Sequence, residues 1–176
     1  MQIKFPIIIG LGNPGKEYAK TFHNAGFLFI DYFNDRQPSA PTPKNRDSDQ
    51  SVGAIGYQAL KSDVYMNESG KFVAKTIKKT GAKPEKILIV HDDSDIELGK
   101  YKISFNRNSA GHNGIESIIK TLKTKNFYRL RIGIRPPEKI RKKALDFVLK
   151  KISRKDSEIL NNVFEKAAEE ILVIKK

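Results

Sequence analysis

The chain has 176 residues, a net charge of +13 and no cysteine. This length suits one domain with a single core, so we expect residues 1–176 to form one domain. Without cysteine there are no disulfides, thiolate zinc sites or cysteine nucleophiles, and the apolar stretch from Phe5 to Ile9 is too short for a membrane span, so a cytoplasmic protein is expected.

The positive charge is concentrated in one part of the chain. Residues 100–155 hold 17 Lys and Arg but only 3 Asp and Glu, a net charge of +14, whereas residues 1–99 carry +1 and residues 156–176 carry −2. A lysine-rich surface that only aids solubility would give the same net charge for the whole chain. The concentration favours a polyanionic partner, nucleic acid first.

Predicted strands and helices alternate along the chain. Residues 3–9 are typical of a buried strand, 25–36 of a buried helix, and the Pro- and Ser-rich residues 37–51 of a loop. Further strands are predicted at 55–64, 86–90, 100–105 and 128–134, and further helices at 69–80 and 113–122. The last helix has an apolar face made of Leu160, Val163, Phe164, Ala167, Ala168 and Ile171. This alternation predicts an α/β domain with a mainly parallel sheet and an antiparallel edge.

The turn after the first strand contains Gly10, Gly12 and Gly15, the spacing of a dinucleotide-binding loop, with Asp31 near the distance of a ribose-binding acid. That acid should end a second strand, whereas residues 27–33 are predicted to be helical. We therefore expect no nucleotide cofactor. The alternative is that the tight turn directs the amide of Asn13 into the crevice at the sheet edge.

Each of the three histidines precedes Asn or Asp: His23-Asn24, His91-Asp92 and His112-Asn113. Asp92 follows a predicted central strand, and side chains beyond the carboxyl ends of parallel strands gather at one edge. A carboxylate there can orient His23 as a general base, although a lone histidine before a helix is as compatible with a capping or core role. Asn13, Asn67 and Asn113 also lie at element ends, where they could grip a substrate or only cap helices.

Four carboxylates lie within residues 92–97, which could suggest a magnesium or calcium site. The central glycine of an EF-hand loop is missing, and Asp is common in tight turns after strands. We therefore interpret the run as turn chemistry and expect no metal.

Six segments occur in a characteristic order: 10–18 (GLGNPGKEY), 21–26 (TFHNAG), 66–70 (MNESG), 91–95 (HDDSD), 111–114 (GHNG) and 127–134 (FYRLRIGI). In this order and spacing they resemble the motifs of bacterial-type peptidyl-tRNA hydrolases. The resemblance extends from the first strand to about Leu149. It implies a monomeric, metal-free cytosolic esterase on a single three-layer α/β/α sandwich with a mixed, mainly parallel sheet.

The resemblance also implies a substrate and residue roles. The enzyme would cleave the ester between a peptide and the 3′ ribose of tRNA, with His23 activating water, Asp92 stabilising the base-competent form of His23, and Asn13 binding the peptide backbone. The tRNA 3′ end and ester region would meet Tyr18, Tyr65, Met66, Asn67 and Asn113, with His112 in support. The acceptor-stem phosphates would meet Lys102, Arg107, Arg129 and Arg131.

The chain departs from the family pattern at three places that concern RNA binding. Phe22 stands where a basic residue is usual, Ser104 replaces a tRNA-contacting lysine of some members, and residues 106–110 are not glycine-rich. The alternative function is a non-catalytic RNA-binding protein on the same scaffold, and a nucleotide-dependent oxidoreductase is a second rival. Retention of His23, Asp92 and the three asparagines favours the enzyme.

Overall fold

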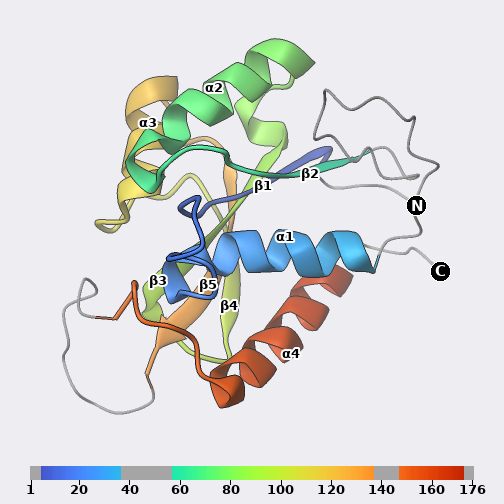
Figure 1. Ribbon diagram of the computed structural model, residues 1–176. Helices are drawn as coiled ribbons and strands as arrows, with labels where there is room; N and C mark the ends of the chain where they lie inside the picture. Colours follow the sequence, from blue (N-terminus) through green and yellow to red (C-terminus); the bar gives the residue numbers. More distant parts are fainter. Residues whose placement is uncertain (1–4, 37–56, 137–146, 173–176) are drawn as a thin grey trace.

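The computed structural model describes residues 5–36, 57–136 and 147–172. These residues form a five-stranded sheet with helices packed against it (Figure 1). The strand order is β2-β1-β3-β5-β4, and all neighbours are parallel except β4 and β5. The strands are β1 (Ile7–Gly10), β2 (Gln58–Lys61), β3 (Ile87–Glu97), β4 (Tyr101–Phe105) and β5 (Tyr128–Arg135). The predicted mixed, mainly parallel sheet with an antiparallel edge is confirmed.

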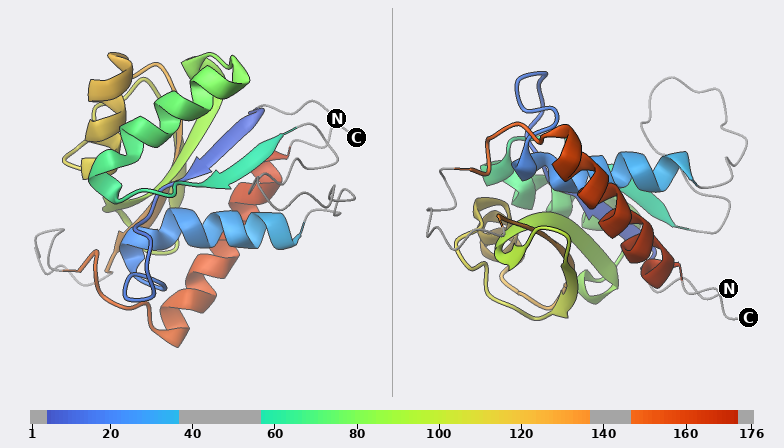
Figure 2. Two further views of the ribbon diagram at one scale, coloured as in Figure 1. Left: turned by 45° about the horizontal axis from the view of Figure 1, so that its top comes forward. Right: turned by 90° about the horizontal axis from the view of Figure 1, so that it is seen from below.

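Helices cover both faces of this sheet, as the two further views in Figure 2 show. Helices α2 (Ser69–Thr80) and α3 (Asn113–Leu122) pack on one face, and α1 (Ala25–Asp35) and α4 (Arg154–Ile171) on the other. Three short 3₁₀ turns, Phe22–Asn24, Met66–Glu68 and Pro84–Lys86, also lie in the described part of the chain. The expected three-layer α/β/α arrangement is confirmed.

The two core clusters follow from the alternation of side chains along each strand. In β3, Leu88 and Val90 face the cluster under α1 and α4, while Ile87 and Ile89 face the cluster under α2 and α3. Because both faces are covered, the central strands are apolar at successive positions rather than alternating. All six apolar residues predicted for the last helix are buried in the first cluster.

Most predicted elements agree with the structure. The helices predicted at 69–80 and 113–122 match α2 and α3, and the first helix ends one residue earlier than expected. The predicted loop at 37–51, residues 3–4 of the first strand and residues 55–56 of the second lie outside the described residues. None of the helices in the described part combines the length and apolarity that a bilayer span requires.

The interpretation of residues 92–97 as a turn was wrong, because β3 continues to Glu97. Its partner β5 is long enough to pair with it as far as Glu97, with a register shift between Asp93 and Glu97. The main-chain N–H of Asp95 also donates to Asp93 Oδ1 at 2.9 Å, a local bond of the kind expected of Asp near a bulge. The acidic residues therefore belong to an irregular strand.

The glycines near the first strand serve close packing. A Cβ atom on Gly26 would overlap the main-chain oxygens of Val90 and Leu11, and one on Gly10 would overlap the main chain of Gly26. Glycine at these positions lets the start of α1 approach β1 and β3 directly. This approach brings the turn that precedes α1, Phe22–Asn24, beside Asp92 in the middle of β3.

Candidate active site

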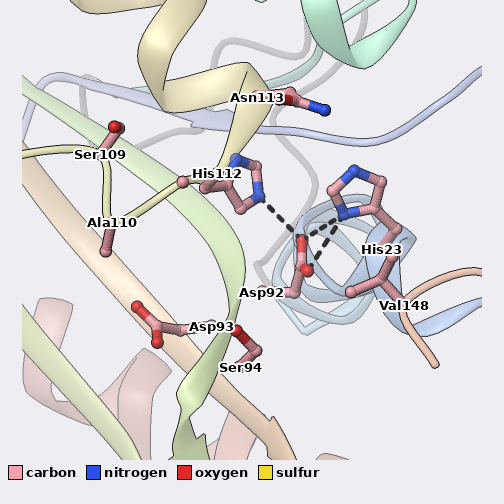
Figure 3. A pocket seen from close by; sticks show the side chains of 10 residues that line it. His23, Asp92, Asp93, Ser94, Ser109, Ala110, His112, Asn113 and Val148 are labelled. Atoms are coloured by element: carbon pink, nitrogen blue, oxygen red, sulfur yellow. Dashed lines mark hydrogen bonds and ion pairs between the residues drawn. The ribbon is translucent and has the colours of Figure 1, made fainter. Parts of the chain in front are cut away.

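The site lies where β1 ends and β3 continues. The pairing of β1 with β3 stops at Gly10 and Val90, so Asp92 lies beyond the end of β1. His23 reaches this position from the turn before α1, and His112 from the residue before α3 (Figure 3). The polar groups therefore gather beyond the carboxyl end of β1, but beside the middle of β3 rather than at its end as expected.

His23 and Asp92 form a hydrogen-bonded pair. His23 Nδ1 lies 2.9 Å from Asp92 Oδ1 and 3.0 Å from Oδ2. Because an ionised carboxylate only accepts, Nδ1 carries the hydrogen and Nε2 keeps its lone pair. Nε2 points away from Asp92, toward the side on which Asn113 lies (Figure 3). Burial lowers the pKa of His23, but the hydrogen bond and charge of Asp92 outweigh it and the pKa is raised.

Asp92 also accepts a hydrogen bond that the sequence did not indicate. His112 Nε2 lies 3.0 Å from Asp92 Oδ1, so two imidazoles meet one carboxylate that is only 2 % exposed. Burial raises the pKa of Asp92, but the two histidines more than offset this and hold it well below its usual range. Asp92 is therefore ionised at neutral pH.

His91 lies inside β3 and does not face the site. Its ring is buried, and Nδ1 donates to the main-chain oxygen of Asp92 at 2.6 Å. Burial, followed by the proximity of His112, keeps the pKa of His91 well below that of free imidazole. The ring is neutral and packs edge-on against His112, with centroids 4.7 Å apart.

The main chain of His23 is held by a segment that is distant in the sequence and that no motif connects with it. His23 N donates to the oxygen of Val148 at 2.7 Å, and Phe22 N to that of Lys150 at 3.2 Å. The ammonium group of Lys151 donates to the main-chain oxygens of Glu17 and Ala19. Residues 147–151 thus fasten the loop that carries the histidine.

Asn13 belongs to a second group of residues. Its Oδ1 accepts from the main-chain N–H of Met66 at 2.7 Å, which leaves its Nδ2 hydrogens directed elsewhere. The side chain of Met66 is buried in the core under α2 and α3, so its main chain rather than its thioether takes part here. Tyr18 and Tyr65 stack edge to face at 6.3 Å, and Tyr65 is half exposed.

A cavity of about 100 Å³ adjoins the two histidines. Asn113 is an exposed residue at its wall, whereas Asn67, also exposed, is not part of the lining. The lining residues are His23, Asp92, Asp93, Ser94, Ser109, Ala110, Gly111, His112, Asn113 and Val148.

A larger, basic cavity of about 440 Å³ shares Asp93 and Ala110 with the first. Its cationic lining comprises Arg107, Lys125, Arg129 and Arg131. Lys125 was not among the predicted contacts, although it lies in the basic segment that the charge distribution singles out. The predicted Lys102 is exposed on β4 and is not part of this lining.

The two arginines of β5 in this cavity are tied to the protein in different ways. Arg131 Nε donates to Asp93 Oδ2 at 2.7 Å, which neutralises part of its charge, and Nη1 reaches Ser104 Oγ at 3.5 Å. Arg129 is 2 % exposed and donates to the main-chain oxygen of Asn108 at 3.1 Å. Burial, followed by the charge of Arg131, lowers the pKa of Arg129 to about 10, so it remains a cation. Phe22, which stands at another of the three departures from the family pattern, packs in the core.

The donor chemistry of the site does not suit a metal ion. His23, Asp92 and His112 are the one group of potential ligands found together among the described residues. The two imidazole nitrogens that face Asp92 each donate a hydrogen to it, so neither offers a lone pair. Two of the other three carboxylates of β3 are already paired with cations, Asp93 with Arg131 and Glu97 with Lys100.

A histidine with a free Nε2, oriented by a buried carboxylate at the end of a parallel sheet and beside a basic cavity, defines a general-base enzyme for a polyanionic substrate. The family model for peptidyl-tRNA hydrolase matches residues 7–176. The chain therefore belongs to the peptidyl-tRNA hydrolase family.

Individual relatives agree with this assignment. The chain is 37 % identical to peptidyl-tRNA hydrolase of Lactobacillus johnsonii over 163 residues, which are 90 % of this chain and 86 % of the relative. It is 39 % identical to that of Prochlorococcus marinus over 173 residues, which are 94 % and 85 %. The crystal structure of peptidyl-tRNA hydrolase from Acinetobacter baumannii superposes with a TM-score of 0.78 at 31 % identity, over 97 % of this chain and 88 % of that one.

Proposed function

We propose that this protein hydrolyses the ester bond between the peptide, or N-blocked aminoacyl, group and the 3′ ribose of tRNA, which returns tRNA from peptidyl-tRNA to translation. The single observation that carries the chemistry is the bond from His23 Nδ1 to Asp92, which leaves Nε2 as a base on the side of the ring that points away from Asp92. Family membership supports the choice of substrate.

In the proposed mechanism, His23 Nε2 takes a proton from water as the oxygen attacks the ester carbonyl. The tetrahedral intermediate then expels the ribose oxygen, which receives the proton from the imidazolium, so the products are a peptide acid and free tRNA. Asp92 stabilises the imidazolium that forms between these steps. General-base assistance of this kind contributes roughly 10²- to 10⁴-fold to the rate.

The substrate would be held by amide and aromatic groups around the histidine. The Nδ2 hydrogens of Asn13 suit a peptide carbonyl, because Oδ1 is already bound to Met66 N. Asn67 and Asn113 offer further neutral donors and acceptors. Tyr18 and Tyr65 offer an aromatic surface on which an unpaired base can stack.

The phosphates near the ester would occupy the basic cavity. Arg107, Lys125 and Arg129 supply positive charge there, and Lys102 extends it along β4. Arg131 contributes less, because Asp93 already pairs with it. Because the cavity shares a wall with the catalytic one, a bound phosphate would fix the position of the ester relative to His23.

The direct test is release of N-acetyl-amino acid from N-acetyl-aminoacyl-tRNA by the wild type and by His23→Ala. Release by the wild type and a loss of about 100-fold or more in the variant are expected. If the wild type binds tRNA without release, the protein is an RNA-binding relative on the same scaffold. Equal release by both proteins would remove His23 from its role.

We also propose that the chain acts as a monomer in the cytoplasm and that residues 1–176 behave as one domain. Size-exclusion chromatography with light scattering tests the oligomeric state, and a dimer at micromolar concentration would contradict it.

A further inference from the structure

The protonation pattern of His112 follows from the helix that it precedes. Its Nδ1 lies 3.1 Å from the main-chain N of Gly114 and 3.3 Å from that of Ile115, so the imidazole caps the start of α3. A main-chain N–H can only donate, so Nδ1 must present a lone pair. The single hydrogen of the neutral ring therefore sits on Nε2, which faces Asp92 Oδ1 at 3.0 Å.

His23 and His112 are consequently opposite tautomers that donate to the same carboxylate. His23 donates from Nδ1 and His112 from Nε2, and their ring centroids are 5.1 Å apart. For His23 the tautomer is set by Asp92, whereas for His112 it is set by α3. A carboxylate with two such donors has little freedom to rotate away from either.

We propose that His112 is a positioning residue that couples the start of α3 to the catalytic pair: α3 fixes the His112 tautomer, and His112 fixes Asp92 against His23. It acts through Asp92 and does not grip the substrate. This inference rests on the proposed role of His23. The tautomer of His112 and its capping of α3 can nevertheless be measured without any reaction.

The neighbours of His112 support a fixed ring. The ring packs edge-on against that of His91, and its side chain is only 10 % exposed. A Cβ on Gly114 would approach Met66 Sδ, Leu11 Cδ1 and His112 Cε1, so the first turn of α3 is pressed against the core at this point. The cap, the ring and Asp92 therefore form one connected unit.

Two substitutions each remove one of the two interactions of the His112 ring, the hydrogen bond to Asp92 or the cap of α3. In His112→Asn the amide oxygen takes the place of Nδ1 and can cap α3, but no donor reaches Asp92. In His112→Gln the amide nitrogen takes the place of Nε2 and can donate to Asp92, but the cap is lost. We expect the Asn variant to lose kcat roughly 10- to 100-fold with KM nearly unchanged. The Gln variant should keep most of its kcat and lose about 2–4 °C in Tm.

The tautomers can be observed directly by long-range ¹H–¹⁵N correlation of the imidazole rings in the wild type, above the titration of His23. The Nε2–H form for His112 together with the Nδ1–H form for His23 is expected. An Nδ1–H form for His112 would overturn the inference. So would a rise in KM at constant kcat in the Asn variant, which would make His112 a substrate contact. If the wild type released no peptide, the proposed function would fail, while the tautomers and the Tm of the Gln variant would still decide the role of the cap.

Discussion

Asn24 binds the main chain of Asn13 through both ends of its amide. Asn13 N donates to Asn24 Oδ1 at 2.8 Å, and Asn24 Nδ2 donates to Asn13 O at 3.0 Å. Asn24 is buried and directly follows His23 in the chain. One side chain therefore links the loop of the proposed peptide-binding asparagine to the turn that carries the base.

Replacing Asn24 by Ala should loosen the Asn13 loop. The change leaves an N–H and a C=O of Asn13 without their partner, which costs about 2 kcal/mol of unfolding free energy. We expect KM for N-acetyl-aminoacyl-tRNA to rise more than kcat falls, because Asn13 is displaced while the His23–Asp92 bond remains. Steady-state kinetics test this, with the exposed Asn162→Ala in α4 as the control. A KM equal to that of the control would contradict the link.

The pH dependence should report His23. Its pKa is raised above 6.5, and only the neutral ring can accept a proton, so kcat/KM should fall with decreasing pH and be half-maximal above pH 6.5. In Asp92→Asn both raising causes are weakened while burial remains, so the acid limb should shift to lower pH and the maximum rate should fall at least 10-fold. Asp63→Asn, on the exposed surface, is the control. An unchanged acid limb in Asp92→Asn would refute the assignment.

Gly26→Ala should be far more destabilising than Gly81→Ala. A methyl group on Gly26 meets the main chain of Val90 and Leu11, which cannot move without displacing β3, so about 3 kcal/mol is expected. Gly81 has open space around it and a φ of 68°, so alanine there costs about 1 kcal/mol from backbone strain alone. Urea unfolding measures both values. Equal losses would show that α1 can shift at little cost.

The basic cavity should be visible in the salt dependence of KM. If Arg107 contacts one phosphate, Arg107→Gln should reduce the slope of log KM against log salt by about 0.7 to 0.9. Lys78→Gln makes the same charge change on α2 and should leave the slope as in the wild type. Equal slopes in all three proteins would place the phosphates elsewhere.

The helices and strands were predictable because burial leaves a local record in the sequence. The bounds of α2 and α3 follow from helical periodicity and from end signals such as Gly81, and the apolar face of α4 is visible in the spacing of its residues. The end of β3 was not predictable in this way. Its polar residues remain in a strand because β5 extends beside them, which depends on a partner distant in the sequence.

By itself, the sequence determined that the turn after β1 and Asp92 lie at one edge of the sheet, since parallel strands joined by helices bring their ends together. It also showed that the positive charge is concentrated in residues 100–155 and that each of the three histidines precedes Asn or Asp. Only the tertiary structure decided that Asp92 accepts hydrogen bonds from both His23 and His112. It also decided that α3 sets the tautomer of His112, that Asp92 sets the tautomer of His23, and that Asn24 binds the main chain of Asn13. The reason is physical: periodicity records which face of an element is buried, whereas a hydrogen bond between residues 69 apart depends on the direction of each donor and acceptor after the elements have packed.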